Sequence, residues 1–264
     1  MTLQQMTKEF QSIKFSIDDR VAQITFARPP LNVFNIAMMR EIGDALGECV
    51  TRRDLAAIVF DAAADTRAFS AGVAVEEHFA ETIFQMLEAF HSIFRVLRQI
   101  AKPVIAVVDG PALGGGCELV AACDIVIASE RARFGQPEIK LGVFPPVAAI
   151  LLPRVIGEKR ARELILTGDL IDAAEALKLG LVNYVLPSAE LEGKTENILA
   201  KLRELSGSSL AMTRMALDLG GQSDFDAALA EVENLYLHEL MKTEDAQEGS
   251  RAFMEKRKPE WRNK

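Results

Sequence analysis

A run of three glycines, Gly114 to Gly116, is followed almost at once by the carboxylate of Glu118. Glycines directly before a helix let the backbone approach a ligand and leave N–H groups free for an anion or a developing oxyanion. The run matches neither the G-x-x-x-x-G-K-[ST] phosphate loop nor the G-x-G-x-x-G dinucleotide pattern. On the glycines alone, a tight strand-to-helix connection is the simpler interpretation.

Two carboxylates in apolar surroundings favour a catalytic role for the segment around the glycine run. Glu118 opens the otherwise apolar helix ELVAAC, and Glu138 lies further on, in FGQPEIKLGVFPP. A buried carboxylate costs free energy unless it is hydrogen-bonded or has a shifted pKa. A helix N-terminal acid stabilised by the helix dipole is the plainer alternative for Glu118. Two such acids suit general acid–base catalysis, although the sequence does not show that they meet.

Other catalytic and metal-binding patterns are absent from the sequence. The histidines lack an i, i+4 partner for a metal, and no G-x-S-x-G elbow accompanies them; they are His78, His91 and His238. The three cysteines lack zinc or disulfide spacing; they are Cys49, Cys117 and Cys123. We therefore expect no metal site and a reducing, cytoplasmic location.

Composition excludes several classes of protein. The 264 residues are 49% hydrophobic and carry a net charge of -8, which disfavours nucleic-acid binding. No apolar stretch is long enough to span a membrane, and the polar N-terminus lacks the pattern of a secretory signal. The basic run Lys256-Arg257-Lys258, taken by itself, is typical of a solvated tail.

The elements that must position these residues alternate along the chain. Apolar spacing predicts strands within 13–26, at 56–61, from 104 and at 124–129, with helices at 36–50, 81–100 and 118–123. Residues 62–73 are small and polar, which predicts a loop. After Pro187 only helical patterns remain, over 190–238. The sequence therefore predicts an α/β body followed by an all-helical C-terminal part.

At these motifs the sequence resembles the crotonase family of enoyl-CoA hydratases and isomerases. The matching segments follow the family's order; they are AFSAG at 68–72, KPVIAVVDGPALGGGCELVAACDIVIAS at 102–129, ARFGQPEIKLGVFP at 132–145, LTGDLIDAAEALKLGLVNYVLP at 166–187 and TEDAQEGSRAFMEKRKP at 243–259. The resemblance implies a spiral core of β-β-α turns over residues 1–206 and a C-terminal helical oligomerisation segment over 207–264. It also implies a homotrimer or a dimer of trimers.

The resemblance implies specific roles within a site for a coenzyme A thioester. The backbone N–H groups of Val73 and Gly115 would hold the thioester oxygen, so the glycine run becomes an oxyanion hole. Glu118 would take a proton from water, and Glu138 would deliver one to the α-carbon. Ala71 would meet the adenine with its backbone. Lys256 would reach the CoA phosphate of a neighbouring subunit. Coenzyme A belongs to the substrate, so no separate cofactor is expected.

Two positions depart from the family pattern. Pro146 replaces a glycine whose N–H helps to hold the water in linear-chain hydratases, and proline has no N–H to donate. The water must therefore be held differently. Ala74 stands where the family often has Asp, and His78 follows where a residue lining the acyl pocket is expected.

The motif FGQPEIKLGVFPPVA most resembles hydratases of cyclic dienoyl-CoA thioesters such as cyclohexa-1,5-diene-1-carbonyl-CoA, which act in anaerobic aromatic degradation. The expected activity is that of a carbon–oxygen lyase which adds water reversibly to a conjugated double bond. A straight-chain enoyl-CoA hydratase of fatty-acid oxidation and an enoyl-CoA isomerase are the alternatives within the family. A non-catalytic oligomer that binds RNA or acts as a scaffold is the alternative outside enzymes, and the negative charge and both acids disfavour it.

Overall fold

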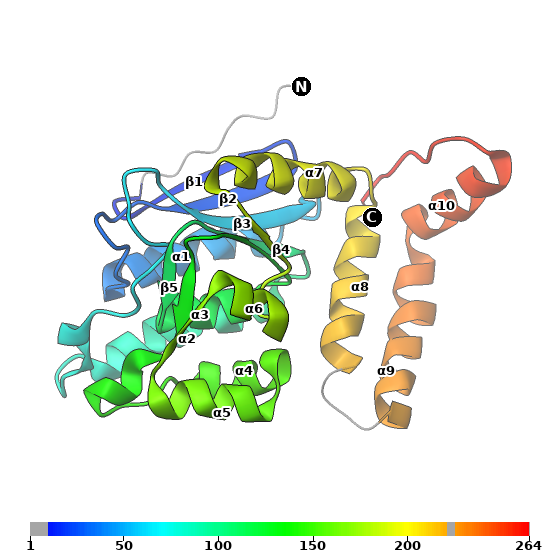
Figure 1. Ribbon diagram of the computed structural model, residues 1–264. Helices are drawn as coiled ribbons and strands as arrows, with labels where there is room; N and C mark the ends of the chain where they lie inside the picture. The colour runs from blue at the N-terminus through cyan, green and yellow to red at the C-terminus, as the bar shows by residue number, and fades with distance from the viewer. Residues whose placement is uncertain (1–9, 221–224, 264) are drawn as a thin grey trace.

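The chain folds around a six-stranded sheet in the computed structural model, which describes residues 10–220 and 225–263 (Figure 1). The strands lie in the spatial order β1-β2-β3-β4-β6-β9; their bounds are Ile13–Asp18, Val21–Phe26, Ala57–Ala62, Val104–Val108, Ile125–Ser129 and Tyr184–Leu186. β1 and β2 form an antiparallel pair, and each later neighbour is parallel. Parallel strands need crossover connections, which explains the helical segments between them.

Helices cover both faces of this sheet. α1 (Ile36–Val50) and α2 (Ile83–Gln99) pack against one another and against the main core on one face. α7 (Leu191–Arg203) covers the opposite face, where Leu191 and Leu199 pack on Val59 and Ile105. Strands buried on both faces read as continuous apolar runs, as VIAVV of β4 does.

A smaller three-stranded sheet carries the segments on either side of the glycine run. Its strands are β5 (Pro111–Leu113), β7 (Arg133–Gly135) and β8 (Leu170–Asp172), with β5 parallel to β7 and β7 antiparallel to β8. α3 (Gly115–Ala121) begins two residues after β5, and the 3-10 helix η2 (Pro137–Leu141) begins two residues after β7. The pairing of β5 with β7 therefore brings the two segments that carry Glu118 and Glu138 together.

The remaining elements of the body are short helices. α4 (Ala148–Ile156), α5 (Glu158–Thr167) and α6 (Ala173–Leu179) follow η2, and the 3-10 helices η1 (Val75–His78) and η3 (Ser188–Glu190) lie in connections. Two helices, α8 (Gly207–Gly220) and α9 (Phe225–His238), run side by side away from the sheets, and η4 (Leu240–Lys242) and α10 (Glu244–Glu255) complete the C-terminal part (Figure 1).

The predicted α/β body and helical C-terminal part are confirmed. The helix expected at 36–50 has those bounds, whereas α2 begins at Ile83 and ends at Gln99. The segment 62–73 is mostly irregular, but Ser70 and Val73 form isolated bridges with Ala112 and Phe34. α8 begins directly after residue 206; the division into 1–206 and 207–264 as folding units stays a prediction.

Candidate active site

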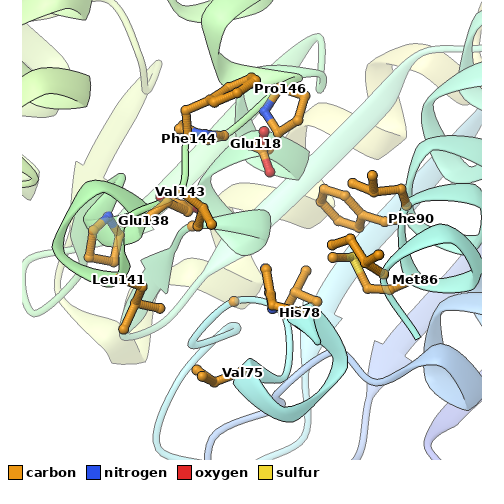
Figure 2. A pocket seen from close by; sticks show the side chains of 18 of the residues that line it. Val75, His78, Met86, Phe90, Glu118, Glu138, Leu141, Val143, Phe144 and Pro146 are labelled. Atoms are coloured by element: carbon orange, nitrogen blue, oxygen red, sulfur yellow. The ribbon is translucent and has the colours of Figure 1, made fainter. Parts of the chain in front are cut away.

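A cavity of about 350 Å³ lies between η1 and α2 on one side and the segment from η2 to the start of α4 on the other. Figure 2 shows Glu118 beside Pro146 and Phe144, with Phe90 and Met86 projecting from α2 opposite them. Both predicted catalytic acids line this cavity, as do four other predicted residues, Ala71, Val73, His78 and Pro146. The lining is otherwise largely apolar, so charges inside it are poorly solvated.

Glu118 lies on α3 with its side chain almost wholly buried, at 2% relative exposure. The backbone N–H of Ala148 donates to Glu118 Oε1 at 2.8 Å. Burial raises the pKa of Glu118 to about 8, against the opposing effect of the Ala148 N–H, and the neighbouring charge of Glu138 raises it further. The carboxyl is therefore a group that can hold or release a proton near neutral pH.

Glu138 lies on η2 and is half-buried. Burial is also the main cause that raises the pKa of Glu138, to about 7. The fully buried Gln136 amide, oriented to satisfy its neighbours, donates to Oε2 and Oε1 of Glu138 at 3.2 and 3.3 Å. These contacts hold the carboxylate toward the glycine run.

Each of the three glycines is required by a different neighbour. A Cβ atom on Gly114, where φ is +51°, would lie 2.6 Å from Glu138 Oε1. On Gly115 it would lie 2.9 Å from the tip of the Phe90 ring, and on Gly116 2.8 Å from the carbonyl oxygen of Ser70. The three glycines therefore allow neighbouring atoms to approach the backbone closely at three points, and chain flexibility is not their role.

The backbone N–H groups of Val73 and Gly115 lie near each other. A Cβ atom on Gly72 would lie 3.6 Å from Gly115 N, and one on Gly115 would lie 3.0 Å from Val73 Cγ2. Within residues 10–220 and 225–263, neither N–H has a hydrogen-bond acceptor. Bonds from Phe34 N to Gly72 O and from Ala74 N to Phe34 O, at 2.8 and 2.9 Å, hold this segment in place. Two free donors thus lie beside a cavity that contains two carboxyls.

The other predicted residues fall into two groups. Ala71, His78 and Pro146 line the cavity, and His78 Nδ1 lies 3.0 Å from the carbonyl oxygen of Ala74. Lys256 is exposed, with φ +53°, just beyond α10 and outside the cavity lining. Its predicted contact with a neighbouring subunit's ligand stays a prediction.

Three features of the site are absent from the sequence predictions. Phe90 has the helical spacing of a core residue, which conceals that its ring also lines the cavity. Gln136 lies two residues before Glu138, and this nearness in sequence is the one indication that its amide could contact the carboxylate. The Ala148 N–H is a backbone donor, so no residue type could have indicated it.

No group of three or more His, Cys, Asp or Glu side chains in the described part of the chain is arranged to hold a metal ion. None of the described helices is both long and apolar enough to cross a membrane.

Comparisons with known proteins agree with this geometry. The family model described as enoyl-CoA hydratase/isomerase matches residues 16–264. The cyclohexa-1,5-dienecarbonyl-CoA hydratase of Thauera aromatica is 37% identical over 250 residues, covering 94% of this chain and 95% of that protein. The short-chain-enoyl-CoA hydratase of Clostridium acetobutylicum is 37% identical over 259 residues, with 96% and 98% covered.

A solved structure supports the same assignment. The crystal structure of the enoyl-CoA hydratase from Bacillus anthracis superposes with a TM-score of 0.90 at 32% identity, covering 96% of this chain and 100% of that one. The fold of the chain is thus the crotonase fold, as the motifs predicted. The chain belongs to the enoyl-CoA hydratase/isomerase family.

Proposed function

We propose that this enzyme adds water across the α,β double bond of an enoyl-CoA thioester at the cavity between Glu118 and Glu138. The observation that carries the proposal is the presence of two carboxyls with raised pKa values in one cavity, beside the free N–H groups of Val73 and Gly115. Proton donors and acceptors work best when their pKa lies near the working pH.

The proposed step balances in protons and charge. The water oxygen bonds to the β-carbon, and one water proton passes to ionised Glu118. The double-bond electrons move to the thioester oxygen, where the Val73 and Gly115 N–H groups stabilise the enolate. Protonated Glu138 then gives its proton to the α-carbon. Glu118 ends protonated and Glu138 ionised, and one proton transfer between them, through solvent, restores the starting state.

The two carboxyls can share one proton in either of two arrangements. Burial raises the pKa of both Glu118 and Glu138, so the pair can hold a proton near neutral pH. With the proton on Glu118 the pair is ready for the reverse reaction, in which Glu118 protonates the leaving hydroxyl and Glu138 removes the α-proton. Hydration uses the other arrangement of the same proton, which the Ala148 N–H favours by stabilising ionised Glu118.

For the acyl group we propose a cyclic dienoyl ring. The support is the cavity wall formed by Phe144, Pro145 and Pro146, which is apolar and stiffened by two prolines, and the likeness to the Thauera aromatica hydratase. A straight-chain substrate is the second candidate, favoured by an equal identity to the short-chain hydratase of Clostridium acetobutylicum.

Turnover on crotonyl-CoA and on cyclohexa-1,5-diene-1-carbonyl-CoA separates these candidates. We expect hydration of both, with the larger kcat/KM on the cyclic substrate. A larger kcat/KM on crotonyl-CoA would assign the enzyme to straight chains, and formation of a shifted double bond without a hydroxyl product would assign it to isomerisation.

Replacement of each acid tests the proposed chemistry. Glu118→Gln and Glu138→Gln are each expected to lower kcat by about 10²-fold or more, because each removes a general acid or base. Glu163→Gln is the matched control, since Glu163 is exposed and pairs with Arg160 on α5. A folded Glu118→Gln enzyme with near-normal turnover would contradict the assignment.

A further inference from the structure

A second, larger cavity lies behind the catalytic one. Its volume is about 750 Å³, and Pro146 lines both cavities. Along α2, Phe90 lines the first cavity and Phe94 and Leu97 line the second. Along α3, Glu118 lines the first, and Ala121 and the C-cap residue Ala122 line the second. Residues three or four apart on a helix lie one turn apart, so the two cavities lie in series along both helices.

The wall between the cavities is built around Phe90. Its side chain is 3% exposed, and its ring packs edge-on against Phe94, with ring centroids 5.0 Å apart and an interplanar angle of 78°. The tip of the Phe90 ring also approaches Gly115, where an added Cβ atom would lie 2.9 Å away. The ring therefore stands between the proposed oxyanion site and the second cavity, with Pro146 as the other part of the wall.

We infer that Phe90 determines acyl specificity by setting the length limit of the acyl group. This inference rests on the proposed function, because it places the thioester carbonyl at Gly115. From that point a short chain or a single ring fits in front of Phe90. A longer chain directed along α2 meets the ring, although the second cavity, lined in part by apolar side chains, lies behind it.

The second cavity would accept methylene groups if the wall were removed. Its lining combines the small or apolar side chains of Ala121, Ala122 and Leu151 with charged groups, of which the buried Arg214 is already paired with Asp124. Each methylene that leaves water for an apolar space contributes about fourfold to binding. Four additional buried methylenes would therefore give a large and measurable gain.

The test compares chain-length profiles of the full enzyme and of variants in the wall. For Phe90→Ala and the milder Phe90→Leu, kcat/KM is measured on crotonyl-, 2-hexenoyl-, 2-octenoyl- and 2-decenoyl-CoA, after circular dichroism has checked folding. We expect the ratio of the decenoyl to the crotonyl value to rise at least about tenfold in Phe90→Ala, and less in Phe90→Leu. A wild-type enzyme already equally active on both, or variants with an unchanged ratio, would overturn the inference.

A blocking variant tests whether the gain uses the second cavity. Leu217 on α8 is 74% exposed and, of these two cavities, lines the second and not the first. Leu217→Trp combined with Phe90→Ala should reverse the gain on decenoyl-CoA, while Leu217→Trp alone should leave crotonyl-CoA turnover unchanged. Persistence of the gain in the double variant would contradict a route through that cavity.

Binding of saturated thioesters separates failure of this inference from failure of the proposed function. Butanoyl-CoA and decanoyl-CoA cannot be hydrated, so calorimetric Kd values report on the wall even if the wild-type enzyme hydrates no straight chain. A selective gain for decanoyl-CoA in Phe90→Ala supports the inference, and equal gains for both ligands or none overturn it.

Discussion

The carboxyl of Glu118 combines a catalytic position with an energetic cost. Folding places it in a site with 2% exposure, where backbone donors, chiefly the Ala148 N–H, compensate only in part for lost water. The folded pKa is about 8, above the ordinary value of 4.5, so between these values the folded chain keeps a proton that the unfolded chain releases. Stability is therefore lost as the pH rises from about 4.5 to about 8.

Glu118→Gln is accordingly expected to stabilise the fold at alkaline pH while it lowers kcat. The amide keeps the shape and can still accept the Ala148 N–H bond, but it has no charge to desolvate. Urea unfolding at pH 8.5 should give a free energy of unfolding on the order of a few kcal/mol above the wild-type value. At pH 4.5 the difference should vanish, and a pH-independent difference would contradict the linkage.

Gly114 offers a second test of a single residue. Gly114→Ala adds a Cβ that would lie 2.6 Å from Glu138 Oε1 at a positive φ, so the carboxylate must move. We expect kcat to fall by about 10²-fold, because misplacement of a catalytic group by about 1 Å has that effect. Gly47→Ala, at an exposed position of helix α1, is the control, with open space around the new methyl and an expected stabilisation of about 0.5–1 kcal/mol.

Candidate acids could be predicted from the sequence because carboxylates are rare in apolar segments. That Glu118 and Glu138 lie in one cavity could not be predicted, because it depends on the pairing of β5 with β7, strands of three residues each. The role of the Val73 and Gly115 N–H groups was predicted from the family resemblance, because the side chains of these residues do not indicate it. Phe90 had a core pattern in the sequence, and only its neighbours in space reveal its second role.

At the level of elements, Arg214 joins α8 to the body of the protein. Its Nε donates to Asp124 Oδ2 at 2.8 Å, and its Nη1 donates to the Ile100 carbonyl at 2.7 Å, just beyond α2. The side chain is nearly buried. Asp124 in turn accepts a bond from the Val104 N–H at the start of β4. One guanidinium therefore joins α8 to α2 and to the strand edge.

Arg214→Met should loosen α8 while leaving the central sheet intact. Methionine keeps much of the apolar stem but leaves the Ile100 carbonyl without its donor and the Asp124 carboxylate with the Val104 N–H but no cation, a loss of about 1.5–3 kcal/mol for bonds to charged groups. Hydrogen exchange of residues 207–220 should accelerate, with β4 unchanged. Arg160→Met, which removes the pairs of Arg160 with Glu163 on α5 and Glu175 on α6, is the control, and equal effects of the two variants would contradict this role.

Long periodic elements were the predictable ones. The helix 36–50 matches its expected bounds because its apolar spacing continues over fifteen residues. β5, β7, β8 and β9 escaped prediction because three residues are too few to establish an alternating pattern. These short strands nevertheless include β5 and β7, whose pairing assembles the site.

At the scale of the whole molecule, the position of Lys256 has a testable consequence. The residue is exposed beyond α10, outside the lining of the cavity that holds Glu118. If it binds the CoA phosphate of a neighbouring subunit, Lys256→Ala should raise KM severalfold at an unchanged kcat, the signature of lost uniform binding. Sedimentation should also show an oligomer.

Mixed oligomers provide the decisive control. In an oligomer reassembled from Lys256→Ala and Glu118→Gln subunits, some sites keep Glu118 and receive Lys256 from the other chain. These sites should recover the wild-type KM. If an oligomer shown to contain both chains has no activity with the wild-type KM, Lys256 lies outside any shared site.

The triple glycine run also bears on the order of folding. Its three close contacts come from Glu138, Phe90 and Ser70, segments distant in sequence, and the donor beside it comes from Val73. Loop closure makes such long-range contacts slow to form compared with helices. A nascent chain can therefore acquire its helices and still lack a working oxyanion hole, so catalytic competence is acquired only when the body of the chain closes.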